Sequence, residues 1–95
     1  MKRHPLFKEW MGRPTLIITL IYLVNNPPNY PSKILKEIYT THQGLWKTLK
    51  YLSKRKLIYS IRKGKFRYIY LTKKGKETAT KLEELDSIFN NVTIQ

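Results

Sequence analysis

Apolar positions in this chain follow a helical period first, then an alternating one, then a helical one again. Residues 16–24 are almost entirely apolar, with Thr19 as the single interruption. Pro14 suits the first position of a helix, and the Asn-Asn-Pro-Pro segment at 25–28 ends the run sharply. The pattern therefore predicts a helix over 15–24. Because the run is rich in Ile, Leu and Thr, a strand is the competing interpretation.

Two further helices are predicted between residues 31 and 55. Pro31 opens the first, over 31–39, which turns three apolar residues inward: Ile34, Leu35 and Ile38. Thr41 is placed to cap the second, over 42–55. At 100° per residue, Leu45, Leu49 and Leu52 share one stripe of this helix. Polar residues occupy the opposite face, namely Gln43, Lys47, Lys50 and Lys54, with Trp46 and Tyr51 on the flanks.

A β-hairpin follows, with runs of β-formers at 57–62 and 65–71 around Lys63-Gly64. A two-residue turn at Lys63-Gly64 would pair Arg62 with Lys65 and Tyr59 with Tyr68. One face then carries mostly aromatic residues: Leu57, Tyr59, Ile61, Phe66, Tyr68 and Tyr70. The other carries Ile58 and Ile69 at its base and Arg62, Lys65 and Arg67 toward its tip. We expect the aromatic face to pack on the core, with base stacking as the alternative.

The ends of the chain are predicted to be helical. Thr72 can cap a helix over 73–91 whose apolar stripe is Thr78, Leu82, Leu85, Ile88, Phe89 and Val92. A short helix at 4–11 would group Leu6, Phe7, Trp10 and Met11. We expect one domain over 1–95, made of an extension at 1–12, a core at 14–72 and the C-terminal helix at 73–92.

Charge is the strongest compositional signal. Nineteen Lys or Arg residues against six Asp or Glu give a formal net charge of +13. From His42 to Lys76 there are twelve basic residues and no acidic one, whereas four acids cluster between Glu77 and Asp86. This balance indicates a polyanionic partner that meets the middle of the chain.

The order of helices and hairpin resembles the winged-helix regulators of the MarR, ArsR and PadR kind. The resemblance covers residues 15–76. It is carried by Ser32-Lys33-Ile34-Leu35-Lys36-Glu37-Ile38, the turn at Thr40-Thr41, the spacing Leu45, Leu49, Leu52, then Leu57-Ile58 and Leu71-Thr72-Lys73-Lys74-Gly75. Small proteins of this type occur in archaea and their viruses and plasmids. Two positions depart from the common pattern: Lys56 stands where many relatives have Gly, and Trp46 where a small polar residue is frequent.

This resemblance implies an α+β winged helix-turn-helix that binds double-stranded DNA through the helix at 42–55. Its outer side chains would enter the major groove: His42, Gln43, Trp46, Lys47, Lys50 and Lys54. Trp46 could instead pack at the edge of the core. Hairpin-tip residues would reach the neighbouring minor groove: Arg62, Lys63, Lys65 and Arg67. Expected phosphate contacts are Lys33, Thr41, Lys73 and Lys74.

We expect a homodimer that presents two recognition helices to a palindromic site. Its interface would use Phe7, Trp10, Leu82, Leu85, Ile88, Phe89 and Val92. The alternative for the C-terminal stripe is packing on the helix at 15–24. The acidic flank of that helix would face away from DNA.

Several function classes find no support in the sequence. Cysteine is absent, so neither a disulfide nor a thiolate metal site is possible. His4 and His42 are far apart, and no catalytic motif, cofactor site, metal site or small-molecule site is evident. The longest apolar run is half of a membrane span, and no secretory signal is recognisable. We therefore expect a cytoplasmic, nucleoid-associated protein (in the host cytoplasm if viral) that is not an enzyme. The alternatives are an architectural DNA-binding protein and an RNA-binding or protein-interaction module.

Overall fold

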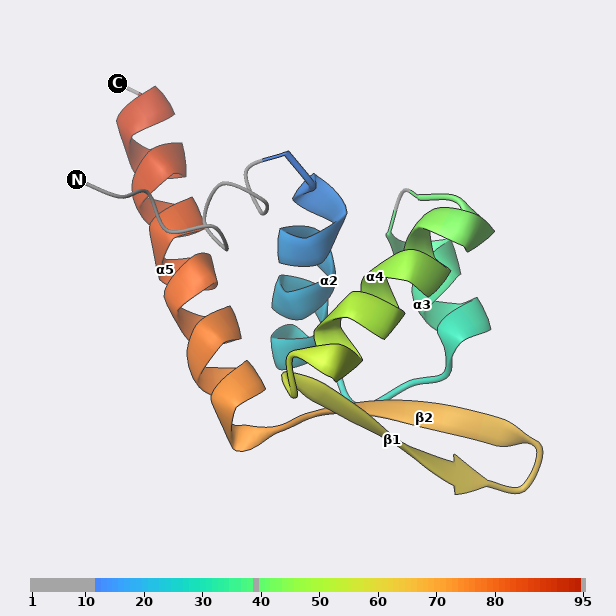
Figure 1. Cartoon of the computed structure of the whole chain (residues 1–95). Coiled ribbons are helices and arrows are strands. Elements are labelled where there is room, and N and C mark those ends of the chain that lie inside the picture. The colour runs from blue at the N-terminus through green and yellow to red at the C-terminus, as the bar shows by residue number, and fades with distance from the viewer. Residues whose placement is uncertain (1–11, 39, 95) are drawn as a thin grey trace.

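The computed structural model describes residues 12–38 and 40–94, with side chains described as far as Ile88. In chain order its elements are α2 (Pro14–Asn25), α3 (Pro31–Glu37), α4 (His42–Lys54), β1 (Ile58–Lys63), β2 (Phe66–Leu71) and α5 (Lys73–Ile94). The expected α+β class is confirmed (Figure 1). The short helix expected at 4–11 and the end of the helix expected at Tyr39 lie outside the described residues.

The core lies where α2 is flanked by α4 and α5 and meets the base of the hairpin (Figure 1). Each element contributes the apolar residues that its own period places on one side. The buried set is Leu16, Leu20, Leu23, Ile34, Ile38, Leu45, Leu49, Leu52, Leu57, Ile58, Ile69 and Ala79. The leucine stripe predicted for α4 is thus confirmed.

The segment at 15–24 is helical, so the competing strand interpretation is wrong. Leu16, Leu20 and Leu23 are buried along one side of α2, a spacing that an alternating strand would split between two faces. The side-chain amides of Asn25 and Asn26 donate to the carbonyl oxygens of Ile21 and Tyr22, at 2.9 and 2.8 Å. These bonds tie both asparagine side chains back onto the last turns of α2.

The turn between α3 and α4 is tight. Thr41 caps α4 as predicted, its Oγ1 accepting a hydrogen bond from the Gly44 N–H at 2.9 Å. The preceding helix ends at Glu37, two residues earlier than expected, because Ile38 is extended (φ −113°, ψ 145°). Ile38 nevertheless reaches the core.

Lys56 adopts a left-handed backbone conformation at the end of α4, with φ 61°. The Leu57 N–H donates to the Leu52 carbonyl and the Lys56 N–H to the Ser53 carbonyl, both at 3.0 Å. This pair of bonds is a Schellman motif, whose left-handed position normally holds Gly. A lysine there costs about 1 kcal/mol of backbone strain. The left-handed backbone explains why Gly is frequent at this position in the resembling sequences. This chain has Lys56 there instead.

The predicted strand pairing of the hairpin is wrong, because the turn lies one residue later in the chain than expected. Observed pairs include Tyr59 with Tyr70, Ile61 with Tyr68, and Arg62 with Arg67. Gly64 and Lys65 occupy the two turn positions, and Gly64 carries the positive φ of 63°. A turn at Lys63-Gly64 of the expected kind would have placed Lys63 at positive φ as well, which a lysine resists. A turn with Gly first avoids that cost and shifts the partner strand by two residues.

The shift preserves the two faces of the hairpin, called the wing from here, but their burial is opposite to the expectation. The inner face, turned to the core and α4, holds Ile58, Ser60, Arg62, Arg67, Ile69 and Leu71. The outer face holds Tyr59, Ile61, Lys63, Phe66, Tyr68 and Tyr70. Ile58 and Ile69 are buried, so the prediction that the aromatic face packs on the core is wrong. Leu57, expected on that face, precedes β1 and lies in the core.

The edge of β2 away from β1 is also occupied. The Ile69 N–H donates to the Asn29 carbonyl at 2.9 Å, forming a single antiparallel bridge. The segment between α2 and α3 therefore lies along the free edge of β2. Tyr30, the residue before α3, consequently packs next to the wing. Periodicity gave no sign of it, because one bridging residue has no pattern.

The predicted cap of the C-terminal helix is confirmed. Thr72 Oγ1 accepts from the Gly75 N–H at 3.0 Å and donates to the Lys56 carbonyl at 2.8 Å. This pair of bonds joins the start of α5 to the end of α4. Gly75 is buried so closely here that a Cβ on it would lie 1.9 Å from the Leu57 carbonyl oxygen. Only a residue without a side chain fits this crossing.

The apolar stripe of α5 divides into two parts. Near the start of the helix, Ala79 is fully buried and Leu82 packs against the core. Further along, Leu85 and Ile88 are 53% and 57% exposed. Packing on α2 therefore accounts for the first half of α5 only, and the second half presents apolar side chains to solvent.

Candidate nucleic-acid interface

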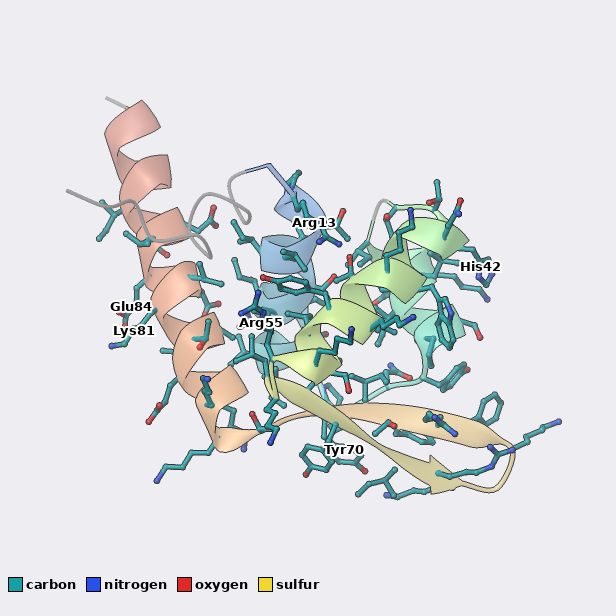
Figure 2. All side chains as sticks on the ribbon, in the orientation of Figure 1. Arg13, His42, Arg55, Tyr70, Lys81 and Glu84 are labelled. Atoms are coloured by element: carbon teal, nitrogen blue, oxygen red, sulfur yellow. The ribbon has the colours of Figure 1, made fainter. Side chains whose placement is uncertain are left out.

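The face of α4 opposite its leucine stripe is fully exposed and carries no acidic residue. All six side chains predicted for it point to solvent: His42, Gln43, Trp46, Lys47, Lys50 and Lys54. Figure 2 shows His42 at the end of α4 that lies away from α5. Trp46 is 67% exposed, so the interpretation that it packs at the core edge is wrong. A tryptophan displayed among lysines offers a flat apolar surface within a cationic field.

A groove of about 460 Å³ lies between α4 and the inner face of the wing. Leu49, Ile58 and Ile69 line it with apolar surface. Three cationic side chains also line it, namely Lys50, Lys54 and Arg67. The groove therefore joins the helix and the wing into one continuous basic surface, which separate predictions for the two elements did not anticipate.

The four basic residues predicted at the wing tip are all exposed, but they do not form one cluster. Arg62 and Arg67 are directly opposite each other on the inner face. Like charges in that arrangement are destabilising, so a bound anion would stabilise this pair. Lys63 lies on the outer face instead, where a hydrogen bond to the Tyr70 hydroxyl raises its pKa. Lys65 belongs to the turn.

The predicted phosphate contacts fall at two separate places. Lys33 in the first turn of α3 and Thr41, the cap of α4, are both exposed, and the capping Thr41 hydroxyl still has its own proton to donate. Lys73 and Lys74 are exposed at the start of α5, which is bonded to the far end of α4 through Thr72 and Lys56. Since α4 is about 20 Å long, the two groups could touch only well-separated phosphates.

Two arginines that the sequence analysis did not single out lie together beside α4. The guanidinium groups of Arg13 and Arg55 are 5.1 and 5.0 Å from the centre of the Tyr51 ring. Tyr51 is predicted on the flank of α4, and Arg55 directly follows this helix in the sequence. The sequence pattern gives no sign that Arg13, the residue before α2, packs on the same ring.

The acidic residues of α5 lie away from α4 (Figure 1), whereas Glu37 ends α3 and accepts a hydrogen bond from the Tyr22 hydroxyl at 3.5 Å. Figure 2 shows Glu84, beside Lys81, on the side of α5 away from the other helices. Glu83 accepts a hydrogen bond from the Asn25 amide at 2.6 Å. Neither α4 nor the wing contains an acidic residue, so all formal charges on these two elements are positive.

Two other kinds of site are not found in the described part of the chain. No group of three His, Cys, Asp or Glu side chains there could hold a metal ion. None of the helices over residues 12–38 and 40–94 combines the length and apolar character that crossing a membrane requires.

Comparison with solved structures identifies the architecture. The transcriptional regulator SlyA superposes with a TM-score of 0.82 at 24% identity, over 96% of this chain and 66% of SlyA. Streptococcus pneumoniae FabT, solved in complex with DNA, gives 0.73 at 20% identity, over 84% and 58%. Archaeoglobus fulgidus AF1382 gives 0.71 at 19% identity, over 78% and 86%.

These likenesses concern structure rather than sequence. No protein-family model matches the chain, and no curated protein matches it by sequence. The chain spans about three fifths of FabT and two thirds of SlyA. The chain has the winged-helix fold, which it shares with the transcriptional regulator SlyA, with α3 and α4 as the helix-turn-helix and β1–β2 as the wing.

Proposed function

We propose that this protein binds double-stranded DNA in a sequence-dependent way and regulates transcription as a homodimer. The observation that carries the proposal is the acid-free basic surface formed by the exposed face of α4 and the inner face of the wing. DNA presents one phosphate per 1.7 Å or so of duplex axis, which such a surface complements. That FabT was solved with DNA bound, on the same fold, supports the proposal.

In this proposal α4 enters the major groove. An α-helix fits that groove, and side chains on its outer face reach the base edges. Gln43 can pair bidentately with adenine, and Lys47 with the guanine acceptors. Lys50 and Lys54 line the groove beside the wing, where they meet the sugar-phosphate backbone. Trp46 and His42 contact sugars or base edges at the same surface.

The wing follows the backbone into the neighbouring minor groove. Arg62 and Arg67, whose charges repel each other in the free protein, both gain a phosphate or a narrow A·T-rich groove as partner. Lys65 at the turn extends this contact. Lys33 and Thr41 bind phosphate from the helix-turn-helix, and Lys73 and Lys74 bind it from the start of α5.

A second copy covers the exposed end of α5. Leu85 and Ile88 are the described side chains that an isolated chain leaves exposed there. The other predicted interface residues are Leu82, Phe7, Trp10, Phe89 and Val92. Two-fold pairing through this stripe would set two recognition helices about 34 Å apart, one turn of DNA. The protein would then act in the cytoplasm on the DNA of the nucleoid.

Alanine substitutions on α4 test the assignment of base contacts. Gln43→Ala and Lys47→Ala should each weaken binding to the preferred duplex by about 1–3 kcal/mol while changing nonspecific binding much less, because they remove base contacts. Lys54→Ala, the matched control on the same face, should weaken both equally through a lost phosphate contact. Fluorescence anisotropy with a preferred and a scrambled duplex at one salt concentration measures the affinities of the wild-type chain and the three variants.

Equal losses on both duplexes for all three variants would contradict sequence-dependent binding. That result would favour an architectural protein that coats DNA through charge alone, a function for which the +13 net charge is sufficient.

A further inference from the structure

The outer face of the wing is an exposed aromatic surface that the duplex-binding account does not use. Tyr59, Ile61 and Phe66 are 44%, 43% and 38% exposed. Tyr68 and Tyr70 are half-buried beside them. Figure 2 shows Tyr70 on the side of the sheet away from the helices. Within the described residues, Tyr30 packs on Phe66 and Tyr68, and the rest of this aromatic face borders solvent or a hollow beside α2.

The rings are ordered against one another. Tyr59 and Tyr70 stack with centres 5.3 Å apart and planes inclined by 16°. Tyr30, delivered by the Asn29 bridge, stacks on Phe66 at 4.3 Å, and its edge meets Tyr68 at 5.9 Å. A platform of this kind is held in place before any ligand arrives, so binding to it costs little side-chain entropy.

Cations border the platform. The ammonium nitrogen of Lys63 lies 5.8 Å from the centres of both the Tyr68 and Tyr70 rings, and that of Lys65 lies 6.0 Å from Phe66. No acid occurs between residues 42 and 76. A ligand that matches this surface has flat groups to stack on the rings and anions to pair with the lysines. A nucleic acid whose bases are unpaired has both.

A hollow of about 360 Å³ opens at the base of the platform. Tyr59 and Tyr70 line it together with polar side chains from the ends of α2 and α5: Asn26, Lys76 and Thr80. The hollow is large enough for one nucleotide. The Asn26 amide could bond a base edge there, the tyrosine rings could stack on the base, and the Lys76 ammonium could pair with a phosphate.

We propose that the outer face of the wing and this hollow bind single-stranded DNA. DNA is the nucleic acid in question because the inner face of the same two-stranded wing is proposed to lie on a duplex. A strand unpaired from that duplex is then only the thickness of the hairpin away. The protein would hold duplex and unpaired strand on opposite faces of one wing, as at a melted site.

An abasic competitor separates stacking from charge. Fluorescence anisotropy of the full chain would compare an oligodeoxythymidylate of about 20 nucleotides with an abasic strand of equal length and charge. We expect the strand with bases to bind at least tenfold more tightly. Phe66→Ala and Tyr70→Ala should each reduce that preference about tenfold and leave duplex binding unchanged. Ile18→Ala, which truncates an exposed apolar residue on α2, is the matched control and should leave the preference intact.

Equal affinity of the wild-type chain for the two strands would overturn the proposal without reference to any variant. Full retention of the preference in both aromatic variants would overturn the placement on the outer face. Tenfold tighter binding to the corresponding oligouridylate would overturn the assignment to DNA. The duplex assay is independent, so failure here leaves the proposed regulatory function standing. Failure of duplex binding alone would remove the argument for DNA, and the comparison with oligouridylate would then decide which nucleic acid is bound.

Discussion

Affinity for duplex DNA is expected to fall by about 10³–10⁵ when salt is raised from about 50 to about 200 mM. The reason is that the dimer would neutralise about 6–10 phosphates and release their counterions. The cationic residues of α4, the groove and the wing tip are exposed and have no acid nearby in sequence, so phosphate is their natural partner. Anisotropy titrations at four or so salt concentrations give the slope of log affinity against log salt.

The same titration with Lys54→Ala supplies the control. Loss of one phosphate contact should reduce the slope by about one for each contact removed. A wild-type slope near zero would contradict the electrostatic account, because it would mean that the basic surface does not meet the backbone.

Gly75→Ala is expected to destabilise the fold by about 2 kcal/mol. The new methyl group would lie 1.9 Å from the Leu57 carbonyl oxygen, and that carbonyl is fixed because it accepts the Thr72 N–H at 3.0 Å. Alanine favours helices by at most about 1 kcal/mol over glycine, so the clash outweighs the gain. Thermal unfolding followed by circular dichroism should show a Tm lower by about 8–16 °C.

Lys56→Gly introduces a glycine instead, at the residue directly before Leu57. It removes the strain of a lysine at φ 61° and should leave the Tm unchanged or raise it by up to about 8 °C. A Gly75→Ala protein as stable as the wild type would show that α5 does not cross Leu57 this closely. A lower Tm for Lys56→Gly would contradict the Schellman geometry.

The helices could be predicted because each carries its own local signals. Pro14, Thr41 and Thr72 mark helix starts by side-chain chemistry alone, and the leucines of α4 repeat at a period that only a helix satisfies. The hairpin register depended instead on one backbone preference. Gly64 could stand first or second in the turn, and periodicity is identical for both choices.

The exposed face of α4 was predictable for the same reason as its core face. The outward aromatic face of the wing was not, since an alternating strand has two faces and the sequence does not say which one meets the core. Only Ile58 and Ile69 of the wing strands are buried, although the opposite face carries more apolar and aromatic side chains. The apolar stripe of α5 predicted either packing on α2 or a dimer interface, and its period does not say that burial on α2 stops before Leu85.

Selection of bound sequences from a random duplex pool at physiological salt tests the central claim most directly. The account predicts enrichment of a palindromic motif whose half-sites are about 10 base pairs apart, with A·T pairs where the wings would lie. A flat profile, in which no sequence is enriched over the starting pool, would contradict it.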